Sequence, residues 1–212
     1  MTLRYERDPA AIYAQSFATV RAEAQLDHLP ADLRDTAIRL VHACGMPEIT
    51  ARLAWSDDVV DASRNALAQG APILCDCEAV ASMIIRKRLP AENPVICTLN
   101  HDLTAPLAKK IGNTRSAAAV EHWRQHLDDA VIAIGNAPTA LFHLLELLDE
   151  GWPRPAAILG FPVGFVGAAE SKAELAANPR GVPFLTLRGR RGGSAMAAAA
   201  VNALAAGLET PV

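Results

Sequence analysis

Short apolar runs that lack polar alternation recur along the chain, and they predict a sheet that is buried on both faces. A strand covered on both sides carries apolar residues at every position, whereas a half-exposed strand alternates apolar and polar residues. Most of these runs end at Gly, Asn or Asp, which are residues typical of turns. The five runs are 72–75, 95–99, 131–134, 156–159 and 183–187.

Segments with apolar residues at helical spacing separate these runs. They are 78–88, 105–111, 115–126, 138–149 and 168–177, and an alanine-rich helix over 195–208 follows the last strand. Alternating strands and helices favour an α/β fold that is doubly wound, with a mainly parallel five-stranded sheet and helices on both faces. The small side chains of the last helix permit close packing or a contact between subunits.

An N-terminal helical segment precedes the sheet. The first helix spans 10–26, with Tyr13 and Phe17 in its apolar stripe and Ser16 beside that stripe. A second helix runs from Pro30 to residue 44 and ends at Gly45. Residues 49–55 form either a strand or an extended lead-in to the next helix, over 58–68.

The stretch 130–172 reads as one complete strand–helix–strand unit. Its first strand closes on Gly135-Asn136 and its second on Gly160. Two parallel strands joined by a helix need a right-handed crossover, which puts both turns at the carboxyl edge of the sheet. Because ligands of open α/β sheets bind at that edge, we expect a site there.

Composition and charge narrow the class of protein. At 212 residues and 51% hydrophobic, the chain suits a single domain over 1–212. A net charge of −3 and 5% aromatic residues argue against nucleic-acid binding. The four cysteines make neither a disulfide framework nor a zinc pattern, which favours reduced thiols and a cytoplasmic location. We expect no signal peptide, membrane span or metal.

His42 is the most promising candidate for acid–base chemistry. It lies one turn after Arg39 on the second predicted helix, near the end of that helix, so both side chains can address one ligand. An imidazole with an ordinary pKa of about 6.5 gives or takes a proton near neutrality. The alternative is a histidine that only hydrogen-bonds the helix end. The other five histidines show no partner pattern and are expected at the surface.

Three further features point to a ligand with many carboxylates and apolar faces. The turn at Asn136 begins a helix whose free amides can hold a carboxylate, or Asn136 simply caps that helix. The loop 160–167 is both apolar and glycine-rich, and with Phe165 it suits a wall for a flat ligand, a contact with a partner subunit or a plain buried loop. Arginines such as Arg86 and Arg115 flank the strands and suit carboxylates, although each alone is ordinarily a solvated residue.

Taken together, six motifs of the chain resemble the precorrin-8X methylmutase family, which includes cobalt-precorrin-8 methylmutase. They are IRLVHACGM (38–46), PILCD (72–76), IGNTRSAAA (111–119), AIGNAPTALF (133–142), ILGFPVGFVGAAESK (158–172) and RGRRGGSAMAAAAVNAL (188–204). The resemblance covers nearly the whole chain, and the 133–172 block is long enough to be specific.

The resemblance implies an isomerase of corrin ring biosynthesis that moves a methyl group from carbon 11 to carbon 12 of precorrin-8X to give hydrogenobyrinate. It implies no metal or organic cofactor, and a homodimer with sites at the subunit interface. His42 in VHACG is then the proton donor and acceptor, and Ser16 and Arg39 match substrate-contacting positions. With the features above, the expected substrate-binding residues are Ser16, Arg39, Arg86, Thr114, Arg115, Asn136 and Phe165.

One departure and two rival functions stand beside this reading. The chain has Met83-Ile84-Ile85-Arg86 where the family tends to carry Gly-aliphatic-Thr-Arg, which removes a hydroxyl from the expected wall. A non-catalytic tetrapyrrole-binding protein would use the same pocket without needing His42. A nucleotide-dependent enzyme is disfavoured because neither GxGxxG nor GxxxxGK[ST] is present.

Overall fold

A computed structural model describes residues 3–206, and within them the sheet has six strands in the order β1-β6-β5-β4-β2-β3. All neighbouring pairs are parallel except β1, which pairs antiparallel with β6. The strands are β1 (Leu53–Trp55), β2 (Ile73–Cys75), β3 (Val95–Cys97), β4 (Val131–Ile134), β5 (Ala157–Gly160) and β6 (Phe184–Leu187).

The prediction of five strands is therefore wrong by one edge strand. The ambiguous segment 49–55 divides into the 3-10 helix η1 (Pro47–Arg52) and the strand β1. Three residues at a sheet edge carry too short a pattern to identify, and the partner strand lies more than 130 residues later, with Leu53 opposite Leu187. The mainly parallel α/β architecture is confirmed.

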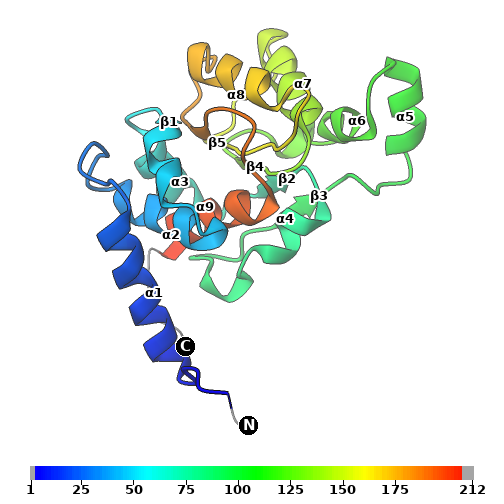
Figure 1. Ribbon diagram of the computed structural model, residues 1–212. Helices are drawn as coiled ribbons and strands as arrows, with labels where there is room; N and C mark the ends of the chain where they lie inside the picture. The colour runs from blue at the N-terminus through cyan, green and yellow to red at the C-terminus, as the bar shows by residue number, and fades with distance from the viewer. Residues whose placement is uncertain (1–2, 207–212) are drawn as a thin grey trace.

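Helices cover both faces of this sheet, as Figure 1 shows. One layer holds α2 (Arg34–Cys44), α3 (Val59–Ala68), α4 (Glu78–Met83) and α9 (Ser194–Ala206), and α1 (Pro9–Glu23) packs on α2. The other holds α6 (Arg115–Glu121), α7 (Pro138–Asp149) and α8 (Ala168–Ala177), with α5 (Thr104–Ile111) packed on α6. The last two residues of the predicted helix 195–208 lie outside the described residues.

Two predicted helices end five residues earlier than expected, at points where buried side chains make tertiary hydrogen bonds. The predicted helix 78–88 stops at Met83, where the Asn202 side chain donates to the Met83 carbonyl and accepts from the Ile85 N–H. The short 3-10 helix η2 (Arg86–Arg88) follows. Similarly, 115–126 ends at Glu121 and continues as η3 (Arg124–His126) beyond the buried Trp123.

Successive residues of the central strands feed two separate cores. In β4, Val131 and Ala133 pack with the layer of α2 and α9, whereas Ile132 and Ile134 pack with the layer of α6 and α7. Both faces of the strand are therefore buried, as the uninterrupted apolar runs predict. Gly135 follows β4 because a Cβ there would lie 2.7 Å from Ser194 Cα, at the start of α9. The end of β4 and the start of α9 are thus in direct contact.

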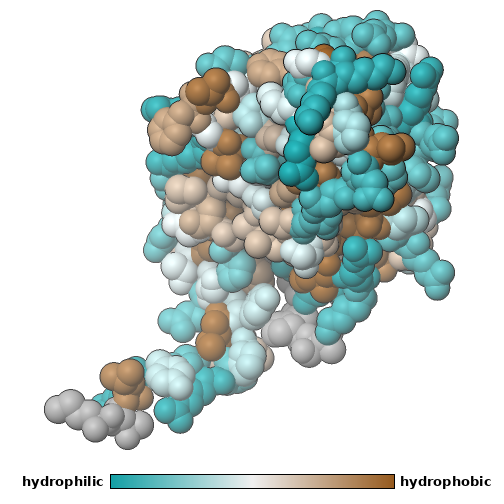
Figure 2. Space-filling view, turned by 90° about the vertical axis from the view of Figure 1, so that its right-hand side faces the viewer, coloured by the Kyte–Doolittle hydropathy of each residue, from teal (hydrophilic) through white to brown (hydrophobic). Residues whose placement is uncertain are grey.

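The helix α1 stands out from the body of the molecule, as Figure 2 shows. Only Phe17 and Val20 of its residues are buried, and Ile12 is an exposed apolar residue on it. No helix in the described part of the chain is long and apolar enough to cross a membrane. Because so few residues of α1 are buried, this helix is attached to the rest of the chain mainly through its contacts with α2.

Candidate active site

The side chain of His42 lies on α2 and faces α1. Its Nδ1 is 2.9 Å from the Ser16 hydroxyl oxygen, a hydrogen bond between two residues 26 positions apart. The rings of Tyr13 and Phe17 lie 5.7 and 5.0 Å from the imidazole, centroid to centroid. Tyr13, Ser16 and Phe17 share one helix face because residues three and four apart are neighbours there. The apolar stripe of α1 is thus also a wall around His42.

Arg39 lies one turn before His42 on α2, and its charge affects the pKa of the imidazole. Its side chain is largely buried, with 5% of the residue exposed, and its guanidinium carbon is 6.0 Å from the Phe17 ring centroid. Partial burial beside α1 lowers the pKa of His42, although the residue stays open to the surface, and the charge of Arg39 lowers it further. Burial and the charge of Arg88 likewise lower the pKa of Arg39. The surroundings favour the neutral imidazole and make its protonated form a stronger acid.

A cavity of about 450 Å³ opens beside Ser16 and His42, and its volume is within the range of small-molecule sites. It is lined by Ile12, Gln15, Ser16, Thr19, Val20, Glu23, Val41, His42, Gly45 and Pro47. Helices α1 and α2 and the turn after α2 therefore form its walls. This cavity does not lie at the carboxyl edge of the sheet, so the site expected at that edge stays a prediction.

The remaining predicted substrate-binding residues lie elsewhere in the chain. Arg86, Thr114, Arg115, Asn136 and Phe165 are not among the described residues that line the His42 cavity, and Arg39, although next to His42 on α2, is not among them either. Arg86 is exposed on η2, and Phe165 is 85% exposed with the Arg190 guanidinium carbon 5.2 Å from its ring centroid. The structure thus groups Ser16, Arg39 and His42 and places the others around the carboxyl edge and on η2.

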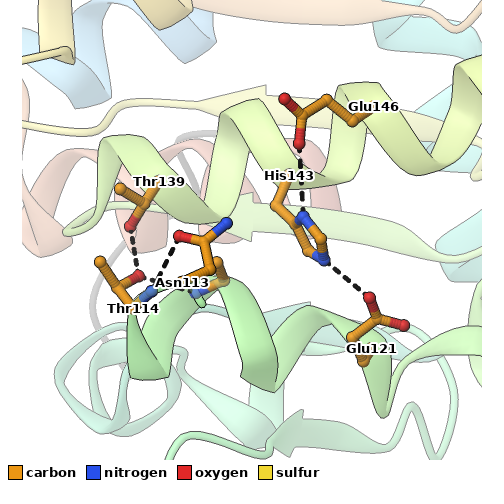
Figure 3. A network of polar contacts seen from close by, with 7 residues as sticks. Asn113, Thr114, Glu121, Thr139, His143 and Glu146 are labelled. Atoms are coloured by element: carbon orange, nitrogen blue, oxygen red, sulfur yellow. Dashed lines mark hydrogen bonds and ion pairs between the residues drawn. The ribbon is translucent and has the colours of Figure 1, made fainter. Parts of the chain in front are cut away.

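Thr114 and Arg115 stand at the start of α6 and are held by polar contacts, of which Figure 3 shows those of Thr114. The Thr114 side chain caps α6 by accepting from the Ala117 N–H, and it shares a 2.8 Å hydrogen bond with the Thr139 hydroxyl on α7. At the far end of α6, His143 bridges Glu121 and Glu146 at 2.8 and 3.4 Å. The helix α6 is therefore clamped to α7 at both ends.

The Arg115 guanidinium reaches the loop that follows β3. It donates to the Leu99 carbonyl at 3.2 Å and to the Asn100 side-chain oxygen at 2.9 Å. Both acceptors are uncharged, so the guanidinium is oriented without being neutralised. Such an arginine remains able to pair with a carboxylate of a ligand.

The turn at Asn136 differs from the prediction in an informative way. The carboxylate of Asp76, which follows β2, accepts the backbone N–H groups of Gly135, Asn136 and Ala137 at 2.9, 2.9 and 2.7 Å. The amides expected to hold a ligand carboxylate are therefore occupied by the protein itself. Asn136 does not cap α7, whose N-cap residue is Ala137 with no side-chain cap. The Asn136 side chain is exposed at this edge.

Asp76 is a charged group that sequence reasoning missed. It is fully buried, and burial raises its pKa although the three N–H donors oppose that rise. His143 was also expected at the surface, but its side chain is only 13% exposed and lies between two carboxylates. Neither could be recognised from sequence, because the partners of each include residues at least 22 positions away. Among the described residues, no group of three or more His, Cys, Asp or Glu side chains is placed to hold a metal ion.

Comparison with known proteins adds independent evidence to this geometry. The family model described as precorrin-8X methylmutase matches residues 11–206. The chain belongs to the precorrin-8X methylmutase family. It is 64% identical over 201 residues to a protein of Pseudomonas aeruginosa named precorrin-8X methylmutase, covering 95% of this chain and 97% of that one.

Two further members of the family are similar over most of their length. A Sinorhizobium protein named precorrin-8X methylmutase is 60% identical over 201 residues, or 95% of this chain and 96% of that one. The crystal structure of the precorrin-8X methylmutase from Thermus thermophilus superposes with a TM-score of 0.82 at 36% identity, over 92% of this chain and 93% of that one. The fold and the family resemblance inferred from the sequence are both confirmed.

Proposed function

We propose that this chain is an isomerase of corrin ring biosynthesis that moves the methyl group on carbon 11 of precorrin-8X to carbon 12, giving hydrogenobyrinate. The observation that carries the proposal is the geometry of the His42 site in a chain of this family. The imidazole is hydrogen-bonded to Ser16, lies near the charge of Arg39 and opens to a cavity. A methyl migration within a conjugated macrocycle requires neither a nucleophile nor a redox group. It requires a proton supplied to the ring system so that electron demand builds where the methyl group arrives.

His42 is the proton donor and acceptor in this mechanism. Ser16 engages Nδ1, and in the described part of the chain Nε2 has no hydrogen-bond partner, so Nε2 is the nitrogen that exchanges a proton with substrate. The lowered pKa keeps the free ring mostly neutral near pH 7 and makes the imidazolium formed on protonation a better donor. General acid catalysis of this kind typically contributes about 10²–10⁴-fold.

The substrate is wide, apolar on its faces and ringed by carboxylates, and the candidate residues suit those features. We assign Ser16 and Arg39 to the part of the macrocycle beside His42. Arg86 and Arg115 then bind peripheral carboxylates, because an arginine can bind a carboxylate in bidentate fashion. Thr114 and Asn136 supply hydrogen bonds at the carboxyl edge, and Phe165 covers an apolar face.

The proposed active unit is a homodimer in which each site draws on both copies. Two observations support this arrangement. The helix α1, which carries Ser16, is largely exposed in the single chain, and the carboxyl-edge candidates do not line the His42 cavity. A second copy related by two-fold symmetry can bring its carboxyl edge to the α1–α2 cavity. The macrocycle is then enclosed on both sides.

The preferred substrate is the metal-free macrocycle, and the reaction uses no added cofactor. The relatives at 64% and 60% identity are named for precorrin-8X, without cobalt in the name. The expected location is the cytoplasm, because the four cysteines, all within the described residues, are free thiols.

Replacing His42 by alanine tests the catalytic assignment. We expect at least a hundredfold loss in the rate of absorbance change when metal-free precorrin-8X is converted, with product affinity within a few-fold of the wild type. His126→Ala, at an exposed histidine of η3, is the matched control and should be unaffected. Wild-type turnover by His42→Ala would refute the assignment, and tight product binding without turnover by the wild type would favour a carrier protein.

A further inference from the structure

Two loops at the carboxyl edge of the sheet are joined to each other. The glycine loop, residues 161–167, follows β5, and the arginine loop, residues 188–193, follows β6. The Gly193 N–H donates to the Phe161 carbonyl at 2.8 Å, and the Gly164 N–H donates to the Arg190 carbonyl at 3.2 Å. The two loops therefore form one layer in which the position of each depends on the other.

The contact between these loops leaves no room for a side chain. A Cβ on Gly192 would overlap the carbonyl oxygens of Phe161 and Pro162. Backbone packs directly on backbone here, as glycine alone permits. A small displacement of the arginine loop is therefore transmitted to the glycine loop.

A buried lysine forms a hydrogen bond with the backbone of the arginine loop. Lys172 on α8 is fully buried, and its Nζ donates to the Arg191 carbonyl. Within residues 3–206, no carboxylate forms an ion pair with it. Burial lowers the pKa of Lys172 to about 8, so the protein carries an electrostatic cost at this position. An apolar residue would avoid that cost but would leave the Arg191 carbonyl without this donor.

The two joined loops carry exposed apolar and basic side chains. Phe165 and Val166 are 85% and 89% exposed, and Arg190 lies against the Phe165 ring. The Arg191 guanidinium pairs with Glu48 at 2.6 Å, next to Pro47, which lines the His42 cavity. The backbone atom held by Lys172 therefore belongs to a residue whose side chain pairs with Glu48, the chain neighbour of a cavity-lining residue.

We propose that Lys172 is a positioning residue for substrate binding, because its buried ammonium group holds the arginine loop against the glycine loop and thereby fixes Phe165, Arg190 and Arg191. Lys172 does not touch the substrate, since its side chain is inaccessible from the surface. The inference rests on the proposed function for the identity of the ligand. The loop attachment itself is independent of that function.

Hydrogen exchange in the unliganded protein tests the attachment directly. In Lys172→Met, the Gly164 and Gly193 amides should exchange at least tenfold faster than in the wild type, while amides of β4 keep their rates. The control is Leu175→Ala, because Leu175 is a fully buried residue of the same helix that packs against Gly160 at the end of β5 and takes part in neither loop hydrogen bond. It should leave the Gly164 and Gly193 rates unchanged. Unchanged rates in Lys172→Met would overturn the proposal.

Steady-state kinetics then test the positioning role. Lys172→Met should raise KM for precorrin-8X at least tenfold, with kcat within threefold and the melting temperature not lowered. Leu175→Ala should lower the melting temperature and leave KM within twofold. Lys172→Arg, which keeps a charged donor, should restore KM at least in part. If Lys172→Met does not fold, Lys172→Gln, whose amide is too short to reach the carbonyl, takes its place with the same expectations.

The outcomes separate this inference from the proposed function. Absence of turnover by the wild type would sink the proposed function, whereas the exchange rates would still decide the attachment. Faster exchange together with a wild-type KM would overturn the positioning role. An equal rise of KM in Leu175→Ala would do the same, because any loss of α8 packing would then suffice.

Discussion

At the scale of single residues, the site is defined by how its surroundings set the protonation of one imidazole. Burial disfavours the charged ring of His42, and the guanidinium of Arg39 one turn away disfavours it further. Ser16 fixes the ring through Nδ1. Ser16 thus orients the ring, and Arg39 and burial tune its acidity.

Removing the charge of Arg39 should therefore raise the pKa of His42. In Arg39→Gln the repulsion that opposes protonation is lost, so the ring holds its proton to higher pH, as an NMR titration of the imidazole would measure. Because the protonated ring is the proposed donor, the pH at which turnover declines on the alkaline side should also move upward. Arg34→Gln, on the same helix, should leave the titration unchanged. A lower or unaltered pKa in Arg39→Gln would contradict this account.

The sequence predicts roles for His42 and Ser16 through the family resemblance, but it does not reveal the buried charges. Asp76 and Lys172 look like ordinary polar residues in the chain. Their burial depends on groups 59 and 19 positions away, Gly135 and Arg191. Local spacing carries no information about such partners, because tertiary packing alone brings them together.

At the scale of elements, the turn after β4 is held by a carboxylate from the neighbouring strand. Asp76 takes three backbone N–H groups at the start of α7, which favours a negative charge there. The carboxyl edge at Asn136 is thereby rigid before any ligand arrives. Preorganised sites lose less free energy on binding.

Substituting Asp76 by alanine should lower the free energy of unfolding by about 3 kcal/mol, because three amides lose a charged acceptor. Asp76→Asn keeps one carbonyl oxygen and should cost less. Urea denaturation measures both, with Asp61→Ala at an exposed position of α3 as the control, expected within about 0.5 kcal/mol of the wild type. A loss in Asp76→Ala no larger than in Asp61→Ala would show that the turn does not need this carboxylate.

The type of each long element follows from the sequence, whereas some boundaries do not. The strands β2 to β6, of which β3 at the sheet edge is only half-buried, and the helices α7 and α8 are close to their predicted ranges because their apolar pattern is strong. The ends of α4 and α6 are set by Asn202 and Trp123, whose bonds reach across the fold. The strand β1 exists only through its pairing with β6.

At the scale of the whole molecule, the candidate residues fall into two separate groups, and the proposed second copy would join them. His42 and Ser16 lie between α1 and α2, whereas Arg115 lies at the start of α6 on the other face of the sheet. In the proposed homodimer, each site takes His42 from one copy and Arg115 from the other. Such a site has a simple genetic test.

Co-expressed His42→Ala and Arg115→Ala variants should recover about a quarter of wild-type activity, although each is inactive alone. Random pairing makes about half of the dimers mixed, and one of the two sites in each mixed dimer is intact. Co-expressed His42→Ala and Ser16→Ala variants are the control, because both residues come from the same copy in each proposed site. Every site of a mixed dimer then lacks either His42 or Ser16, so the activity should not exceed that of Ser16→Ala alone. Recovery no greater than the sum of the separate variants would contradict a shared site.

The slight attachment of α1 has a consequence for how a bulky macrocycle enters and leaves. With only Phe17 and Val20 buried, detaching this helix exposes little apolar surface, so it costs far less free energy than global unfolding. Detachment also withdraws Ser16 from the imidazole. If the ligand enters by this detachment, the cavity opens and Ser16 leaves His42 in one motion, and the proposed proton donor regains its orienting hydroxyl only when α1 returns.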